Sequence, residues 1–245
     1  MAEPKRPSRP FELQQNQTHP GQPRLRALLG LAHGLSVLDR LDEAMSLLDR
    51  AQGEAEEHGL LVEQSRVHTL RGNAYFPRDD IAPCLAEHSE ALRLAEASGA
   101  TEEQARALGG LADAYYMRGL FRTSMKMFER CVQISAAQGF RRIEVAYLPM
   151  LGWTLLLDMQ FAAAAQHCQR AVNLAEQIGH RRAAMIAYDT LAVLGYEMGQ
   201  PESGLHACSS ALAIARSLGA RRFIAYYLMC RAQLEFATGD PFWRR

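Results

Sequence analysis

Three pairs of arginines recur at a fixed distance along the chain and have the chemistry to hold an acidic partner. Arg142, Arg182 and Arg222 are the second members of these pairs, and each pair begins two residues after a glycine. Guanidinium groups bind carboxylates through paired, charge-assisted hydrogen bonds. Arginines at such positions could instead stabilise the carbonyl groups that end the preceding helix, or support packing between repeated units. The sequence leaves both interpretations open.

The other polar residues form no recognisable catalytic or metal-binding pattern. The chain lacks the G-x-x-x-x-G-K-[ST] phosphate loop and the H-E-x-x-H and G-x-S-x-G motifs. Its five cysteines include no C-x-x-C pair, and its eight histidines are scattered without a partner at ligand spacing. We therefore expect a protein that is not an enzyme, with no cofactor and no metal site.

Composition narrows the classes of partner. Hydrophobic residues make up 48% of the chain and charged residues 22%, which is typical of a folded protein. The formal net charge is +0, so the basic surplus of a nucleic-acid-binding protein is missing. The N-terminus does not resemble a signal peptide, and the apolar runs are far too short to cross a bilayer. We expect a cytoplasmic protein that binds neither nucleic acid nor membrane.

Small residues recur every 40 residues from Arg24 onward. Three independent series share this period, and a fixed period of this length is typical of a solenoid of stacked units. The series are Gly59, Gly99, Gly139, Gly179 and Gly219; Ala51, Ala91, Cys131, Ala171 and Ala211; and Ala32, Gly72, Ala112, Gly152, Ala192 and Ala232.

Each unit is predicted to be a pair of amphipathic helices. Between Ala105 and Gly119 apolar or small residues recur at the three-and-four spacing of a helix face, and the pattern returns between Phe121 and Gln138. Gly139 follows where a helix needs a left-handed residue after its last turn. The residues of the third series should lie where the two helices cross, since only alanine or glycine lets the backbones approach closely. We expect more than about 60% helix, roughly double the usual share.

The repeated unit resembles the tetratricopeptide repeat. The resemblance rests on the small residue of the third series, a leucine such as Leu111 one position before it, Tyr75 or Tyr115 three positions after it, and Ala44 or Ala164 twelve positions after it. The family's usual unit has 34 residues, so a 40-residue unit predicts longer helices. This longer variety is similar to the arrays of large bacterial ATPase-linked transcription activators and of adenylate cyclases. The resemblance implies an all-α, right-handed superhelical solenoid of about eleven helices.

The array is predicted to occupy residues 24–240, between a disordered Pro-rich leader at 1–23 and a short tail at 241–245. The predicted units are 24–60, 61–100, 101–140, 141–180 and 181–220, with a partial unit at 221–240. The last helix should therefore lack a partner helix, although it carries apolar residues around most of its circumference. Either the chain is a fragment of a longer regulator, or Phe223, Tyr227 and Phe236 mediate self-association as a homodimer.

The first helix of each pair should line the concave side of the solenoid. Positions six before, one after and four after the crossing residue share one stripe of that helix. Early units place arginines and polar residues on the stripe, and later units place aromatic and apolar residues there. The candidate partner-binding residues are Arg66, Asn73, Arg106, Asp113, Tyr116, Arg142, Trp153, Arg182, Tyr196 and Arg222.

These observations predict a non-catalytic scaffold that binds a protein or peptide in its concave groove. The arginines would hold an acidic segment of the partner, and the aromatic half of the groove would take an apolar anchor. The alternative, which the resemblance implies, is a regulatory or sensor segment of a larger bacterial signalling protein, such as an ATPase-linked transcription activator or an adenylate cyclase.

Overall fold

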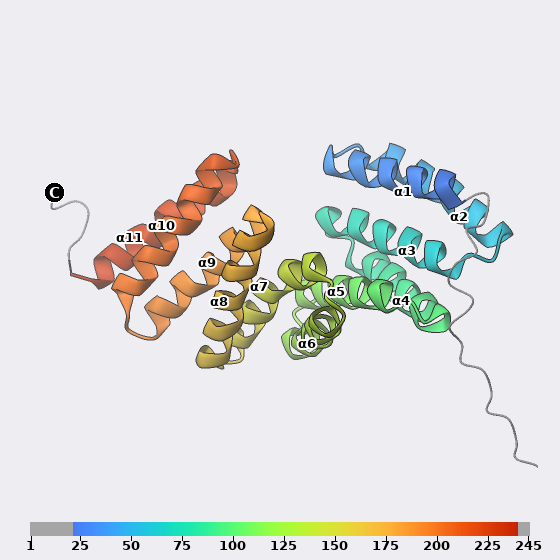
Figure 1. Ribbon diagram of the computed structural model, residues 1–245. Coiled ribbons are helices and arrows are strands. Elements are labelled where there is room, and N and C mark those ends of the chain that lie inside the picture. Colours follow the sequence, from blue (N-terminus) through green and yellow to red (C-terminus); the bar gives the residue numbers. More distant parts are fainter. Residues whose placement is uncertain (1–21, 240–245) are drawn as a thin grey trace, which may run out of the picture.

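The protein is an array of antiparallel helices, seen in a computed structural model that describes residues 22–239. Of these residues 87% are helical, and none lies in a strand. The helices follow one another along a curve from α1 to α11 (Figure 1), which confirms the predicted all-α solenoid. They are α1 (Gln22–Val37), α2 (Leu41–Glu57), α3 (Leu61–Tyr75), α4 (Ile81–Ser98), α5 (Thr101–Met117), α6 (Phe121–Gln138), α7 (Arg141–Leu157), α8 (Phe161–Ile178), α9 (Arg181–Glu197), α10 (Pro201–Ser217) and α11 (Arg221–Ala237), with a short 3-10 helix at Phe76–Arg78.

The helices alternate between two roles, and we call α1, α3, α5, α7, α9 and α11 the first helices and the even-numbered ones the second helices. Because α1 begins at Gln22, residues 22 and 23 belong to the first helix and not to the leader in which the sequence placed them. The rest of the predicted leader, residues 1–21, and the predicted tail lie outside the described residues.

The chain reverses direction at the same position after every helix. A residue with positive φ stands every 20 residues from position 39 to position 239, and eight of these eleven residues are glycine, which adopts this conformation without strain. Gly139, with a φ of 74°, ends α6 in the left-handed conformation that the sequence predicted. The three exceptions are Asp39, Asp79 and Met159.

Small residues allow the two helices of a unit to cross closely. A Cβ atom added to Gly152 of α7 would lie 2.3 Å from Cys168 Sγ and 3.3 Å from the Ala164 carbonyl oxygen, both in α8. Ala112, at the same position one unit earlier, is fully buried. These contacts confirm that the third series of small residues marks the helix crossings. Ala232 of α11 is the exposed member of the series, because no helix within residues 22–239 covers that face.

His88 of α4 fills the space that glycines leave on two first helices. A Cβ atom on Gly72 of α3 would lie 2.5 Å from His88 Nε2, and one on Gly110 of α5 would lie 2.2 Å from His88 Cε1. The side chain is only 1% exposed, and its Nδ1 atom has no hydrogen-bond partner among the described residues. Burial lowers the pKa of this imidazole to about 4.

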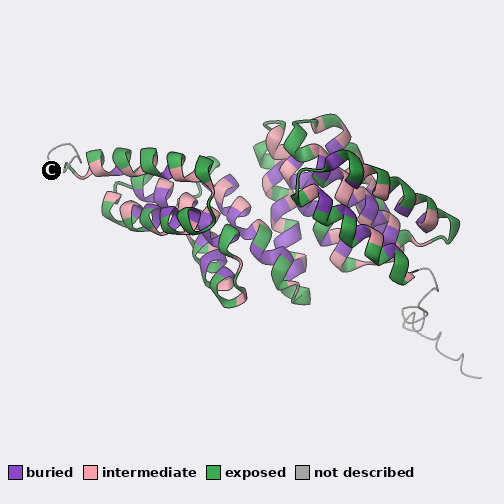
Figure 2. Ribbon diagram, turned by 90° about the horizontal axis from the view of Figure 1, so that it is seen from above, coloured by how far each residue is buried: buried purple, intermediate pink, exposed green. Residues whose placement is uncertain are grey.

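The core consists of buried residues that are spread along the helices of the whole array (Figure 2). The last helix contributes least to it: α11 buries Tyr227 and Leu234, whereas the preceding first helix, α9, buries eight residues. None of the helices within residues 22–239 combines the length and apolar character needed to cross a membrane.

Candidate functional site

Four first helices converge on a cavity of about 530 Å³ on the concave side of the array. We call it the arginine pocket. Its arginine side chains come from three successive first helices, whereas leucine, isoleucine and tyrosine side chains supply apolar surface. The lining residues are Leu29, Gly30 and His33 of α1; Arg66, Thr69, Leu70 and Asn73 of α3; Glu103 and Arg106 of α5; and Arg142, Ile143, Ala146 and Tyr147 of α7.

The arginine pocket brings together four of the residues that the sequence placed in the groove. Arg66, Asn73, Arg106 and Arg142 all line it. Asn73, Arg106 and Arg142 are exposed, and Arg66 is half-buried. Arg142, the second arginine of the first Arg-Arg pair, therefore lies in the same pocket as the residues of the predicted groove stripe in α3 and α5.

Arg66 links neighbouring units through a buried carboxylate. Its Nε atom donates a hydrogen bond of 2.7 Å to Glu103 Oε1 of the next first helix, and its Nη1 atom lies 3.9 Å from Glu63 Oε1. The Glu103 and Glu63 side chains are only 2% and 3% exposed. Buried carboxylates require such partners, because an unpaired buried charge is strongly unfavourable. Arg66 therefore supports the contact between units, as the structural interpretation of the arginines requires.

The other two arginines of the pocket differ in how far their charge is neutralised. Arg106 donates to Glu102 Oε1 at 2.5 Å, and its Nε atom lies 3.7 Å from Glu103 Oε2. Arg142 has no hydrogen-bond or ion-pair partner within residues 22–239, and no bond joins it to a carbonyl that ends the preceding helix. Arg142 therefore supplies a positive charge that the described protein does not neutralise.

Two buried polar atoms at the pocket have no hydrogen-bond partner among the described residues. They are Thr69 Oγ1 and Glu103 Oε2, each shielded from solvent and without a hydrogen bond. Buried polar groups are nearly always hydrogen-bonded in native proteins. Glu103 Oε2 keeps only the ion pair with Arg106, whose Nε atom lies 3.7 Å away.

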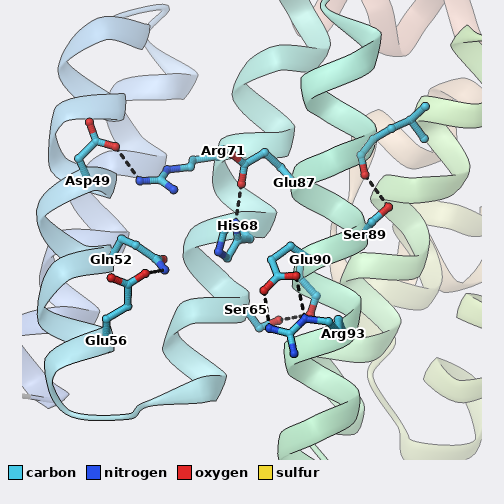
Figure 3. A network of polar contacts seen from close by, with 12 residues as sticks. Asp49, Gln52, Glu56, Ser65, His68, Arg71, Glu87, Ser89, Glu90 and Arg93 are labelled. Carbon is cyan, nitrogen blue, oxygen red and sulfur yellow. Dashed lines mark hydrogen bonds and ion pairs between the residues drawn. The ribbon is translucent and has the colours of Figure 1, made fainter.

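Other basic side chains of α3 are occupied by neighbouring helices (Figure 3). Arg71 Nη2 donates to Asp49 Oδ1 of α2 at 2.6 Å, and His68 Nδ1 lies 2.6 Å from Glu87 Oε2 of α4. These bonds tie α3 to both second helices beside it. Together with Arg66, all three basic side chains of α3 are therefore engaged in contacts with other helices.

The aromatic residues predicted for the middle of the groove bind one another. Trp153 Nε1 of α7 donates to the Tyr116 hydroxyl of α5 at 2.8 Å, and the Tyr116 ring lies 5.4 Å from that of Phe121. Both Trp153 and Tyr116 are half-buried and hold α5 and α7 together. Asp113 is also half-buried, lies outside the arginine pocket, and has a pKa raised by burial to about 7.

A second, smaller cavity of about 230 Å³ lies between α9 and α11, and we call it the tyrosine pocket. It includes the predicted groove residue Tyr196, which is 53% exposed. The predicted Arg182 and Arg222 are exposed but line neither pocket. The lining residues are Ala192, Val193, Tyr196 and Glu197 of α9, and Tyr226, Met229, Cys230, Gln233 and Leu234 of α11.

The structure corrects one residue of the predicted self-association surface. Tyr227 is 1% exposed, because its side chain turns into the core formed with α9 and α10. The half-buried Phe223 stacks on it, with ring centroids 6.1 Å apart. Phe236 is 66% exposed. Tyr227 therefore cannot contribute to an exposed surface, whereas Phe236 can.

No family model matches the sequence, and no curated protein matches it. Solved structures share its architecture. BtubC from P. vanneervenii has a TM-score of 0.66 and 15% identity, over 88% of this chain and 85% of that one. A Pyrococcus horikoshii signal transduction ATPase with numerous domains (STAND) and a tetratricopeptide repeat sensor has a TM-score of 0.69 and 17% identity, over 90% of this chain and 34% of that one. The chain has a tetratricopeptide-type fold.

A third similar structure holds a ligand. The Rap conjugation gene regulator of the plasmid pLS20, in complex with the Phr* peptide, has a TM-score of 0.66 and 14% identity, over 91% of this chain and 62% of that one. At these identities the likeness establishes the tetratricopeptide-type fold that the sequence predicted.

The arginine pocket and the tyrosine pocket of this tetratricopeptide-type array each include a junction at which two successive first helices are widely separated. The junctions α5–α7 and α9–α11 have fewer close approaches than α1–α3, α3–α5 or α7–α9. Each wide junction carries a tyrosine five positions before the crossing residue, namely Tyr147 and Tyr227, where the preceding first helices carry Ala107 and Ala187. A Cβ atom on Gly109 of α5 would lie 2.1 Å from the Tyr147 ring, so this ring rests directly on the α5 backbone. Tyr147 thus acts as a spacer between α5 and α7, and Tyr227 occupies the same register position at the α9–α11 junction.

The tetratricopeptide-type array shows no metal-binding arrangement in its described part, where no three His, Cys, Asp or Glu side chains gather suitably. Four of the five cysteines are buried. Burial raises the pKa of Cys84 to about 11 and that of Cys131 to about 12, so these thiols stay protonated at neutral pH and are poor nucleophiles.

Proposed function

We propose that the chain is a non-catalytic scaffold that binds a protein or peptide in its concave groove, with an acidic side chain of the partner in the arginine pocket. The observation that carries the proposal is Arg142, an exposed guanidinium without a partner among the described residues, on the wall of a 530 Å³ cavity. Charge-assisted hydrogen bonds to a carboxylate would give this cation the partner that it lacks.

The three arginines of the arginine pocket differ in whether they are already paired. Arg66 lies between the carboxylates of Glu63 and Glu103, and Arg106 is paired with Glu102. Arg142 is the lining arginine without an ion pair among the described residues, so it is the one placed to bind a carboxylate of the partner. The likeness to a Rap protein that binds the Phr* peptide supports a peptide as ligand.

Arg142→Glu should abolish the preference for acidic peptides. We would measure fluorescence polarisation with acetylated, amidated hexapeptides in pairs that differ only by Asp→Asn or Glu→Gln. A hydrogen bond to a charged group contributes about 1.5–3 kcal/mol, so the best acidic peptide should bind Arg142→Glu roughly tenfold to hundredfold more weakly than the wild type.

Arg141→Glu is the matched control, because it makes the same charge change one residue away, at a side chain that lines a different hollow. Arg141 lines a shallow depression with residues of α8 and does not reach the arginine pocket. The proposal fails if both variants lose the same affinity, or if wild-type protein does not distinguish the acidic peptide from its amide counterpart.

The second candidate function is a sensor segment of a larger nucleotide-dependent regulator. The likeness to the STAND ATPase with a tetratricopeptide repeat sensor supports it. A nucleotide-hydrolysing polypeptide that co-purifies with this chain, and that is lost with Arg142→Glu but not with Arg141→Glu, would identify the acidic partner as that regulator.

We also propose that α11 mediates self-association. Leu228, Met229 and Phe236 are 44%, 55% and 66% exposed on one helix, and exposed apolar residues that gather together can mark an interaction surface. Light scattering at increasing concentration should show a dimer for the wild type and a monomer for Leu228→Glu/Met229→Glu. Leu31→Glu/Val37→Glu, which alters exposed apolar residues of α1, should still dimerise. A wild-type monomer at every concentration would reject the proposal.

A further inference from the structure

The tyrosine pocket is negatively charged, in contrast to the arginine pocket. No lysine, arginine or histidine lines it. Glu197, at the end of α9, is exposed and has no partner within residues 22–239. Arg231, which follows the lining residue Cys230 in the sequence, donates to Glu235 Oε1 at 2.8 Å. The described residues therefore leave the carboxylate of this pocket without a cation.

A second carboxyl group lies behind the tyrosine pocket. Asp189 of α9 is half-buried beside the Tyr226 hydroxyl, and its Oδ1 atom is buried without a hydrogen-bond partner among the described residues. Burial raises the pKa of Asp189 to about 6, and the Tyr226 hydroxyl opposes this rise. Asp189 is thus mainly ionised at neutral pH and adds to the negative potential on the inner side of the Tyr226 ring.

The walls of the pocket suit a side chain with an apolar stem and a cationic end. Tyr196 and Tyr226 contribute two aromatic rings, and Val193 and Met229 contribute apolar surface. Aromatic rings attract cations by about 0.5–1 kcal/mol at exposed sites. Long basic side chains bury their methylene stems and keep the charge at the rim. The volume of about 230 Å³ has room for one long side chain and is less than half that of the arginine pocket.

We propose that the tyrosine pocket binds a lysine or arginine side chain of the partner, with its charge between the tyrosine rings and Glu197. The proposal rests on the proposed function and extends it, because the groove then binds a segment with an acidic side chain at one end and a basic one at the other. This assignment replaces the apolar anchor that the sequence placed in the later units. It also fixes the direction of the bound segment, since a reversed segment would meet like charges in both pockets.

The test uses two small probes that differ only in charge. N-acetyl-lysine N-methylamide carries the ammonium group, and N-acetyl-2-aminoheptanoic acid N-methylamide has a pentyl side chain of the same length without it. Each is titrated into full-length protein with isotopically labelled tyrosine rings, and binding is followed by NMR. Tyr196 and Tyr226 report on the tyrosine pocket, and Tyr147 reports on the arginine pocket.

We expect the lysine probe to shift the Tyr196 and Tyr226 signals and to bind about threefold to tenfold more tightly than the pentyl probe. Glu197→Gln should remove most of this difference. Glu202→Gln, which changes an exposed glutamate of α10 outside the pocket, should preserve it.

Equal or tighter binding of the pentyl probe would overturn the proposal in favour of an apolar anchor, and so would the absence of any shift at Tyr196 and Tyr226. The arginine pocket is tested separately with N-acetyl-aspartate N-methylamide, which should shift Tyr147 in the wild type and not in Arg142→Glu. A shift at Tyr147 without one at Tyr226 would reject the cation site and leave the proposed function standing.

Discussion

Arg66→Met should lower the free energy of unfolding by about 2–3 kcal/mol, which corresponds to a fall of roughly 5–10 °C in the thermal midpoint. The substitution removes the 2.7 Å hydrogen bond to Glu103, whose side chain is 2% exposed. Removing one partner of a buried pair typically costs about 3–5 kcal/mol. We expect the smaller loss of about 2–3 kcal/mol because Arg66 is 33% exposed, and because Arg106 stays 3.7 Å from the Glu103 carboxylate after the substitution.

The double variant Arg66→Met/Glu103→Leu should recover most of the stability lost in Arg66→Met. Replacing both members of a buried ion pair by apolar residues of similar size is often neutral or favourable, because no unpaired charge remains. Thermal and urea unfolding of the wild type, both single variants and the double variant would complete the cycle. A double variant less stable than Arg66→Met would show that the pair is not the source of the effect.

Arg93→Met provides the comparison for an exposed pair. Arg93 binds Glu90 at 2.5 Å, but both side chains are largely in solvent, at 63% and 38% exposure. Exposed pairs contribute at most about 1 kcal/mol, so Arg93→Met should unfold close to the wild-type midpoint.

The structural role of Arg66 also explains why Arg142, and not Arg66, is the residue to substitute in a binding experiment. A loss of binding in an Arg66 variant could result from a destabilised array.

His88 should make the array sensitive to mild acid. Its pKa is lowered from 6.5 to about 4 by burial between α3 and α5, so the unfolded chain takes up a proton before the native protein does. Stability from the neutral imidazole is fully present above about pH 6.5 and is lost as pH falls to 4. The loss amounts to about 3 kcal/mol, because a shift of one pKa unit corresponds to about 1.36 kcal/mol.

The measurement compares the wild type with His88→Leu in urea unfolding between pH 7 and pH 4. As the pH falls, the free energy of unfolding of the wild type should decrease by about 3 kcal/mol relative to that of His88→Leu. The comparison between the two proteins is needed because Asp113, which both contain, has the opposite effect. Burial raises the pKa of Asp113 to about 7, so this residue stabilises the native protein as the pH falls below that value. His206→Leu, at an exposed histidine of α10, should follow the wild-type profile. Parallel profiles for the wild type and His88→Leu would contradict the expectation.

The 40-residue period predicts the fold well because helix ends and helix crossings recur at the same positions in every unit. Gly139 ends α6, and Gly152 meets Cys168, since both positions repeat in register and have one physical reason in every unit. The exposed Ala232 follows from the same register, because α11 is a first helix and no described second helix covers it.

The candidate site was only partly predictable because it depends on contacts between units, where the residues differ. The stripe that contains Arg66 and Arg106 faces the groove, but the sequence does not reveal that Glu103 neutralises Arg66 from the next unit. Tyr227 was misplaced because a terminal helix with apolar residues on most sides does not indicate which of them face the core. A tyrosine at position 147, where the three preceding units carry Ala27, Val67 and Ala107, was the signal that could have located the arginine pocket.

Tyr147 and Tyr227 stand at the same register position, and the two wide junctions of the array are the ones that carry them. At the α5–α7 junction the separation of the first helices follows from one side chain, Tyr147, at one register position. Val67 and Ala187 occupy that register in units whose first helices pack closely on the preceding ones. Moving a tyrosine to either position would relocate a cavity by whole units of the solenoid, and the polar residues already present at the new junction would then decide what it holds.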